Sequence, residues 1–150
     1  MKTESAGRLI NELSRASNVY FQHAFRKYNI GHAQIRTLFY ISQNEGQTQK
    51  ALAEYLNLDK SSITSQLQIL EKNGYVEREK SIRDARKQVI NVTDKTRELI
   101  PSLQQVLLSW TETLLDGFDA HERSAIFNYL HKMRLNAGNK LSAIHKQVDC

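Results

Sequence analysis

One change in the spacing of apolar residues limits the folds open to this chain of 150 residues. Before residue 75, the apolar residues recur every three or four positions, which is typical of amphipathic helices. Two short runs, 75–80 and 87–92, alternate instead around a charged centre, which predicts an antiparallel hairpin. The helical spacing then returns. We therefore expect a mainly α-helical protein with one small β-hairpin near its middle.

Four helices are expected before the hairpin and two after it. The predicted ranges are 5–28, 33–44, 49–56, 60–72, a long helix between Thr93 and Gly117, and a last helix from 120 to about 135 or beyond. The expected N-caps of the last four helices are Thr48, Asp59, Thr93 and Asp119. Gly31 is expected to end the first helix in the left-handed conformation.

The helices 49–56 and 60–72 are short, are joined by a tight turn and lead directly into the charged hairpin. This order is typical of a helix-turn-helix with a β-wing. We expect three parts: an N-terminal dimerisation helix (1–32), a winged helix-turn-helix domain (33–93) and C-terminal dimerisation helices (94–150). Three apolar residues of the last helix are expected to face inward: Ile126, Leu130 and Met133.

The positive charge of the chain is concentrated in the hairpin. The whole chain has a net charge of +5, and residues 78–87 alone hold five basic and two acidic residues. Arg83, Arg86 and Lys87 at the tip can reach phosphates, or place an arginine in a minor groove. Asp84 is expected to accept a hydrogen bond from the guanidinium of Arg86 and orient it. The alternative is a solvated turn in which Asp84 caps the tip.

One face of the helix 60–72 is small, uncharged and rich in hydrogen-bonding groups. It lies opposite the apolar residues of that helix and has one base at its C-terminal end. Gln68 can pair with adenine through two hydrogen bonds, and serine or threonine can contact bases or phosphates. The candidate DNA-binding residues of this helix are Ser61, Ser62, Thr64, Ser65, Gln68 and Lys72. The alternative is a plain solvated face.

The stretch from Asp59 to Thr93 resembles the MarR-type winged-helix transcription regulators. The most specific parts are "LEKNGYVER" (70–78) and Asp84-x-Arg86 followed by "VINVT" (89–93), and "TQKALAEYLNLDKSSIT" (48–64) is similar to the helix-turn-helix of that family. The resemblance implies an obligate homodimer of triangular shape that represses or activates nearby genes. It also implies that Asp84 and Arg86 lie at the wing tip, with Arg86 in the minor groove.

The resemblance also suggests a small aromatic or anionic effector between the terminal helices and the winged-helix body. Aromatic residues are frequent in the first two predicted helices, and basic residues lie near them. The candidate effector-binding residues are Arg15, Tyr20, His23 and Phe39. The alternative is that the aromatic residues only pack in the core and in the dimer interface.

Several kinds of site find no support in the sequence. The five histidines show no pair at helical metal-binding spacing, and Cys150 is the only cysteine, so neither a metal site nor a cofactor is expected. No nucleophile–base motif or phosphate-binding loop indicates an enzyme. The N-terminus resembles no signal peptide and no stretch is apolar enough to span a membrane, so we expect a cytoplasmic protein.

Two hypotheses about function follow. The first is a dimeric, sequence-specific DNA-binding regulator, a repressor relieved by a small effector, with the helix 60–72 in the major groove of a pseudo-palindromic operator and the wing 80–87 at the minor groove. The second is a winged-helix module that binds an effector or another protein without binding DNA. The basic wing and the lack of acids at 61, 64, 65, 68 and 72 favour the first.

Overall fold

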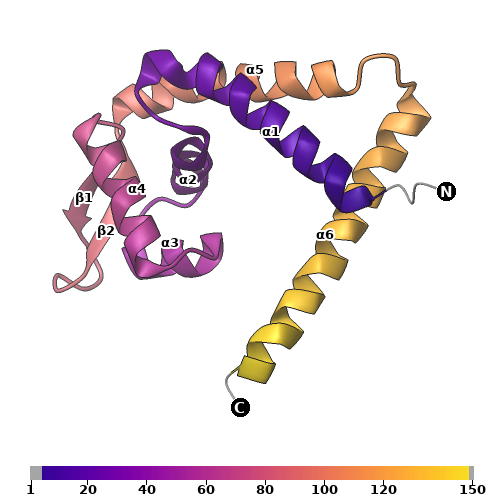
Figure 1. The fold of residues 1–150 in the computed structure, drawn as a ribbon. Helices are drawn as coiled ribbons and strands as arrows, with labels where there is room; N and C mark the ends of the chain where they lie inside the picture. The colour runs from indigo at the N-terminus through magenta and orange to yellow at the C-terminus, as the bar shows by residue number, and fades with distance from the viewer. Residues whose placement is uncertain (1–4, 149–150) are drawn as a thin grey trace. The chain divides into compact units, whose positions relative to one another are not determined.

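The computed structural model describes residues 5–148, and their side chains as far as residue 144. Within these residues, the elements follow one another in this order (Figure 1): α1 Ala6–Phe25, η1 Arg26–Tyr28, α2 His32–Gln43, α3 Gln49–Leu56, α4 Lys60–Lys72, β1 Val76–Lys80, β2 Gln88–Val92, α5 Asp94–Leu114 and α6 Ala120–Val148. The predicted class, mainly helical with a small β-wing, is confirmed. Cys150 lies outside the described residues.

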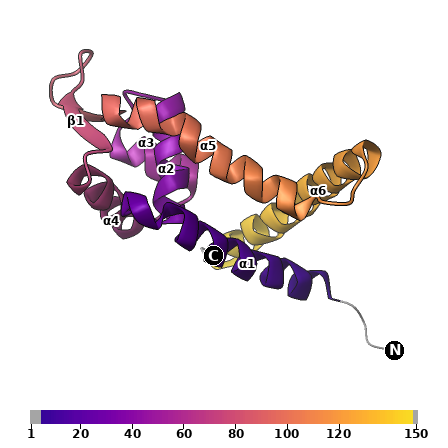
Figure 2. The ribbon, with the colours of Figure 1, turned by 90° about the horizontal axis from the view of Figure 1, so that it is seen from above.

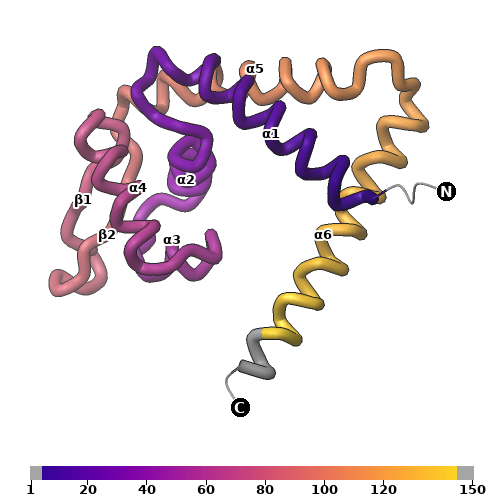
Figure 3. Tube along the Cα trace, viewed as in Figure 1, coloured from indigo at the N-terminus to yellow at the C-terminus, as the bar shows by residue number. Residues whose placement is uncertain are grey.

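The chain divides into two compact units, Met1–Trp110 and Thr111–Cys150. Figure 3 follows the chain of the first unit through α2, α3 and α4 and then into the hairpin. One apolar core holds these elements together, and its fully buried members come from every α-helix of the unit and from β2: Phe25, Ile35, Leu38, Ile41, Leu52, Ile63, Leu67, Leu70, Ile90, Val92 and Leu103. The core therefore fixes the positions of α4 and of the hairpin relative to each other.

Local hydrogen bonds explain where α3 and α4 begin. Thr48 Oγ1 accepts from the N–H of Ala51 at 3.3 Å, and Asp59 Oδ1 accepts from the N–H of Ser62 at 2.7 Å. Asn57, between the two helices, has φ 51° and makes the tight turn in the left-handed region. Both predicted N-caps are confirmed.

The prediction for Gly31 is wrong. Gly31 is extended, with φ −93°, and the left-handed residue is Asn29, with φ 55°. The short 3₁₀ helix after α1 brings the reversal of the chain two residues earlier than expected, and asparagine tolerates that conformation. Gly31 instead begins α2, where its N–H donates to Oε1 of Gln34 at 3.0 Å.

The hairpin is antiparallel, with Val76 opposite Val92 and Lys80 opposite Gln88. It stands out at the edge of the first unit in both views (Figure 1 and Figure 2). The turn between α2 and α3 adds a short third segment, because Gln47 pairs with Ile90 in an isolated antiparallel bridge. The backbone N–H of Ile90 donates to the carbonyl of Gln47 at 2.9 Å. This turn thereby ties the wing to the helix-turn-helix.

The second unit consists mainly of α6, which is longer than the minimum predicted. Asp119 caps it as expected, since Asp119 Oδ1 accepts from the N–H of Glu122 at 2.9 Å. The prediction that Leu130 and Met133 face inward is wrong within a single chain, where they are 49% and 38% exposed. Their spacing does mark one apolar side of the helix, but none of the described residues of this unit covers it.

Candidate nucleic-acid interface

Helix α4 buries one side and exposes the other. Ile63, Leu67 and Leu70 are fully buried. On the opposite side Ser61, Ser65, Gln68 and Lys72 are exposed, whereas Ser62 and Thr64 are half-buried. The face that the sequence predicted therefore exists, although two of its six residues lie at its margin.

Asp59 organises the first turn of α4. Its carboxylate accepts from Ser61 Oγ at 2.6 Å and from Ser62 Oγ at 2.8 Å, in addition to the backbone N–H of Ser62. These bonds hold the pKa of the Asp59 carboxyl well below its usual range, and the bond from the Ser61 hydroxyl has the largest effect. Both serine hydroxyls direct their protons at Asp59, so toward a further partner each offers only lone pairs.

Thr64 joins α4 to α3. Its Oγ1 donates to the carbonyl of Lys60 at 2.6 Å and accepts from Nε2 of Gln49 at 2.7 Å. This hydroxyl is therefore used within the helix-turn-helix. Ser65, Gln68 and Lys72, in contrast, make no side-chain hydrogen bond or ion pair within the described part of the chain. Their polar groups are available to an external partner.

The tip of the wing is held by its own backbone. The N–H of Ser81 donates to the carbonyl of Lys87 at 2.9 Å, and the N–H of Lys87 donates to the carbonyl of Asp84 at 2.9 Å. Ser81 Oγ accepts from the N–H groups of Arg83 and Asp84 at 3.3 and 3.4 Å. Sequence reasoning missed Ser81, although serine is a common residue at such turns. The side chains of Arg83, Arg86 and Lys87 are exposed.

Asp84 does not contact the guanidinium of Arg86, so that predicted contact is wrong. Asp84 Oδ1 accepts from the backbone N–H of Arg86 at 3.1 Å, and Oδ2 lies 4.0 Å from Nζ of Lys87. A short acidic side chain reaches the backbone two residues ahead more readily than a flexible guanidinium. Asp84 therefore caps the tip, which was the alternative interpretation, and fixes the backbone from which Arg86 projects.

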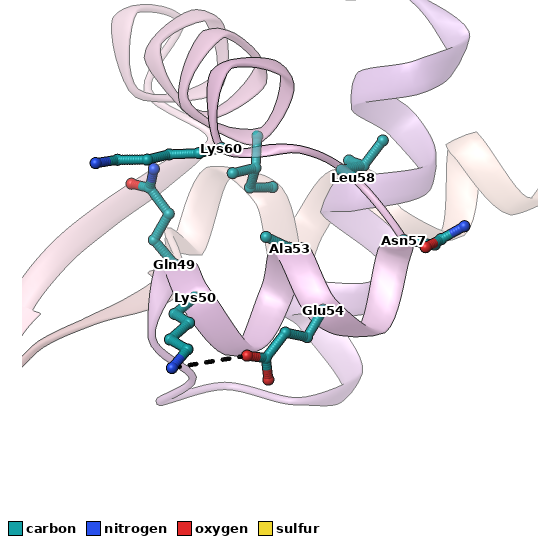
Figure 4. Close-up of a pocket in the computed structure, with 8 residues that line it drawn as sticks. Gln49, Lys50, Ala53, Glu54, Asn57, Leu58 and Lys60 are labelled. Atoms are coloured by element: carbon teal, nitrogen blue, oxygen red, sulfur yellow. Dashed lines mark ion pairs between the residues drawn. The ribbon is translucent and has the colours of Figure 1, made fainter. Parts of the chain in front are cut away.

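A cavity of about 520 Å³ lies between α3 and the start of α4. Its apolar lining is Ala53, Leu58 and Ile63. Figure 4 shows Gln49 and Lys60 at one side of this cavity and Asn57 at the other, with the Lys50–Glu54 ion pair, 3.9 Å long, at the rim. The cavity adjoins the same turn of α4 that Asp59 caps.

The four candidate effector residues have different surroundings. Tyr20 stacks on Trp110 with 4.7 Å between ring centroids, and its hydroxyl lies 3.5 Å from the carbonyl of Val106. Phe39 is half-buried and packs against the core. Arg15 and His23 are exposed on α1. None of the four described pockets is lined by any of these residues.

The described residues form neither a metal site nor a membrane-spanning helix. No three histidine, cysteine or acidic side chains among them lie together in a way that could hold a metal ion. No helix in the described range combines the length and the apolar character that a membrane span requires.

Known proteins share this arrangement. A sequence profile described as MarR family matches residues 28–87. The HTH-type transcriptional regulator BilQ from Clostridioides difficile (strain CD3) is 22% identical over 134 residues, which cover 89% of this chain and 90% of BilQ. MepR from S. aureus, solved in a complex with DNA, is 20% identical, with 89% and 99% of the two chains covered and a TM-score of 0.79. At that identity, MepR shows a similarity of fold alone.

A solved MarR transcriptional regulator from Methanosarcina mazei Go1 is 30% identical, with a TM-score of 0.80. The match covers 89% of this chain and 96% of that protein. The similarity therefore includes the terminal helices as well as the helix-turn-helix and the wing. Since both the sequence and the order of the elements agree along most of the chain, this protein belongs to the MarR family of winged helix-turn-helix transcriptional regulators.

Proposed function

We propose that the protein is a homodimeric repressor that binds double-stranded DNA, with α4 in the major groove and the wing at the minor groove. The observation that carries this proposal concerns Ser65 and Gln68 on α4, which are exposed and have no side-chain hydrogen bond within the described residues. The core that holds α4 also holds the wing, whose tip has two exposed arginines. Amide and hydroxyl groups without internal partners suit base edges, and arginines suit the minor groove. MepR, which has this fold, was solved with DNA.

Ten residues form the proposed DNA contact surface. Ser65 and Gln68 would read base edges, while Lys72 and Lys87 would meet phosphates. Arg83 and Arg86 would enter or line the minor groove, and Asp84 would fix the tip that carries them. Ser61, Ser62 and Thr64 would lie at the N-terminal end of the contact and act mainly through the orientation of α4.

The exposed apolar residues of the terminal helices support a homodimer. Leu13 of α1 is 51% exposed and Leu135 of α6 is 61% exposed, and more large apolar residues of these two helices are exposed in the single chain: Leu9, Ile10, Phe127, Leu130, Leu141 and Ile144. Pairing across a two-fold axis would bury them. The two copies of α4 would then read a pseudo-palindrome whose half-sites lie about 34 Å apart.

Analytical ultracentrifugation at micromolar concentration tests the dimer. Leu130→Lys should shift the protein toward a monomer, because the substitution places a charge in the proposed interface. Lys132→Glu is the matched control on the same helix. A wild-type chain that sediments as a monomer would contradict the homodimer.

Relief of repression by a small aromatic or anionic effector completes the proposal. The exposed Arg15 and His23 of α1 could bind a carboxylate, and the Tyr20–Trp110 stack offers an aromatic partner. Benzoate at millimolar concentration should raise the melting temperature, whereas cyclohexanecarboxylate, which has the charge without the aromatic ring, should raise it less. Ligand at 100 times its Kd stabilises a protein by about 2.7 kcal/mol, so the shift is measurable. Equal, negligible shifts with both acids would exclude this class of effector.

The competing function is a winged-helix interaction module that does not bind DNA. Selection of duplexes from a random-sequence library by the wild-type protein separates the two functions. We expect enrichment of a pseudo-palindrome that binds roughly a thousandfold tighter than random DNA, or better. Fluorescence anisotropy on the selected and random duplexes measures that ratio. An unenriched library, together with an affinity for duplex that does not depend on salt, would support the interaction module instead.

A further inference from the structure

Asn91 makes a hydrogen bond with each end of its side-chain amide, and the two bonds lead to different parts of the fold. Its Oδ1 accepts from the backbone N–H of Gly46 at 2.7 Å, and its Nδ2 donates to Glu79 Oε2 at 2.8 Å. Gly46 belongs to the turn between α2 and α3, and Glu79 belongs to β1. A single side chain on β2 thus joins the helix-turn-helix to the strand that leads into the wing tip.

The strand register places this contact on the outer face of the hairpin. Ile90, the neighbour of Asn91, is fully buried and Asn91 is half-buried, so the two side chains lie on opposite faces. Asn91 pairs with Glu77, and Glu79 pairs with Val89, so Glu79 is one diagonal step closer to the tip. The bond from Asn91 to Glu79 therefore points toward the wing tip, where the arginines lie.

The turn that Asn91 holds is itself fixed. Gly46 has φ 78°, which an L side chain rarely adopts, and its N–H also donates to the carbonyl of Ile90 at 3.2 Å. Its neighbour Glu45 forms an ion pair with Arg97 of α5, with 2.8 Å between the charged atoms. The Asn91 amide is consequently anchored to a turn that has other contacts of its own.

The outer side of the contact between the turn and the wing is hollow. A hollow of about 470 Å³ lies there, and its lining includes Gly46, Glu79, Arg83 and Asn91. The apolar core holds the inner face of the hairpin through Val76, Ile90 and Val92, whereas at the hollow the hairpin is held by polar bonds. Asn91 supplies one bond between the turn and the wing, from Gly46, and one bond inside the hairpin, to Glu79.

We propose that Asn91 is a positioning residue for DNA binding, one that fixes the wing so that Arg86 and Gln68 can contact one duplex together. This inference rests on the proposed DNA-binding function. Asn91 itself does not touch the DNA. Its effect should appear in the affinity that depends on the wing, and not in the contacts that α4 makes alone.

Four variants test the two bonds while controlling charge. Asn91→Ala removes both bonds and should weaken binding to the selected duplex roughly three- to tenfold. Asn91→Asp should also weaken it, because two carboxylates then face each other. The exchange Asn91→Asp with Glu79→Gln restores a donor–acceptor pair with the wild-type net charge, and its affinity should return to within about twofold of the wild type. Asn91→Asp with Glu98→Gln, which has the same net charge but no complementary partner, should stay weak.

Double-mutant cycles then show through which part of the protein Asn91 acts. Asn91→Ala in the Arg86→Ala background should have almost no further effect, since the wing contact is already lost. In the Gln68→Ala background, its effect should be the same as in the wild type. Melting temperatures identify any variant that is merely unfolded.

The outcomes separate this inference from the function on which it rests. If Arg86→Ala leaves the affinity unchanged, the wing does not contact DNA, and both the wing part of the proposed function and this inference are overturned. Two other outcomes reject only the positioning role of Asn91. In one, Arg86→Ala weakens binding, but Asn91→Ala lowers the affinity of the Arg86→Ala variant by the same factor as that of the wild type. In the other, the charge-balanced exchange fails to recover affinity.

Discussion

Arg78 Nε lies 2.6 Å from Glu71 Oε1, which ties the first strand of the wing to the end of α4. Both side chains are partly buried, so water screens this ion pair less than it screens the other ion pairs of the described residues. Either partner replaced by alanine should therefore lower the free energy of unfolding by about 1 kcal/mol. Urea unfolding of both single variants and of the double variant measures the coupling. The exposed pair Lys50–Glu54 is the control, and an equally small coupling for both pairs would contradict this expectation.

Gln68→Ala should change sequence preference more than general affinity. Loss of its amide should cost roughly 1–3 kcal/mol at one base position and relax the preference there. Affinity for random duplex should change little, because phosphate contacts dominate it. Competition assays with every base at each operator position reveal this pattern. A uniform loss over all sequences would instead assign Gln68 to the phosphate backbone.

Two substitutions of Asp84 should affect DNA affinity differently. Asp84→Ala removes the acceptor for the Arg86 N–H, so the tip loses its fixed form and binding should weaken. Asp84→Asn keeps an acceptor at that place and removes a negative charge near the phosphates, so binding should tighten or stay equal. Kd values at several salt concentrations distinguish the two effects. Tighter binding by both variants, each of them folded, would reduce Asp84 to a purely electrostatic role.

Arg86→Ala should weaken binding to every duplex sequence. It should also flatten the plot of log K against log salt by roughly 0.9 for each phosphate contact that is lost. Arg8→Ala, on the exposed surface of α1, is the matched control for loss of one positive charge. The same change in slope for both variants would indicate an effect of total charge alone.

His32 should make stability depend on pH in a defined direction. Partial burial, and then the nearby charge of Arg36, lower the pKa of His32 below its usual 6.5. Its ring also stacks on Phe21, with 4.3 Å between centroids. Because the unfolded chain takes up the proton more readily, this contribution to stability is present above pH 6.5 and is lost as the pH falls toward the lowered pKa.

Urea midpoints between pH 8 and pH 5 measure this dependence against His32→Gln, which does not titrate. The difference in stability between wild type and variant should shrink on acidification. His121→Gln, on the exposed surface of α6, is the control. A difference that grows at low pH would show that the pKa of His32 is raised.

The sequence predicted the features that depend on neighbouring residues. The change in the spacing of apolar residues at position 75 predicted the hairpin. Thr48 and Asp59 could be predicted as N-caps because a cap bonds an N–H group only three positions ahead. The errors have the same origin in local chemistry. The left-handed residue is Asn29 and not Gly31. Asp84 accepts a hydrogen bond from the backbone N–H of Arg86 and not from its guanidinium.

Other features could not be predicted because they join distant parts of the chain. Gly46 and Asn91 are 45 residues apart, and only the bridge between the α2–α3 turn and β2 brings them together. The Gln49–Thr64 bond likewise requires the angle between two helices. For Leu130 and Met133, periodicity identified an apolar side of α6, but it could not show that this side is exposed in the single chain.

The bonds from Ser61 and Ser62 to Asp59 restrict the chemical groups that the start of α4 could read. A hydroxyl whose proton is donated to Asp59 would meet DNA only as a hydrogen-bond acceptor, beside a carboxylate that remains ionised at neutral pH. Guanine, which shows only acceptors at its major-groove edge, is a poor partner for that turn, whereas the exocyclic amino groups of adenine and cytosine suit it. The N-cap of α4 would thus bias the base composition of the operator.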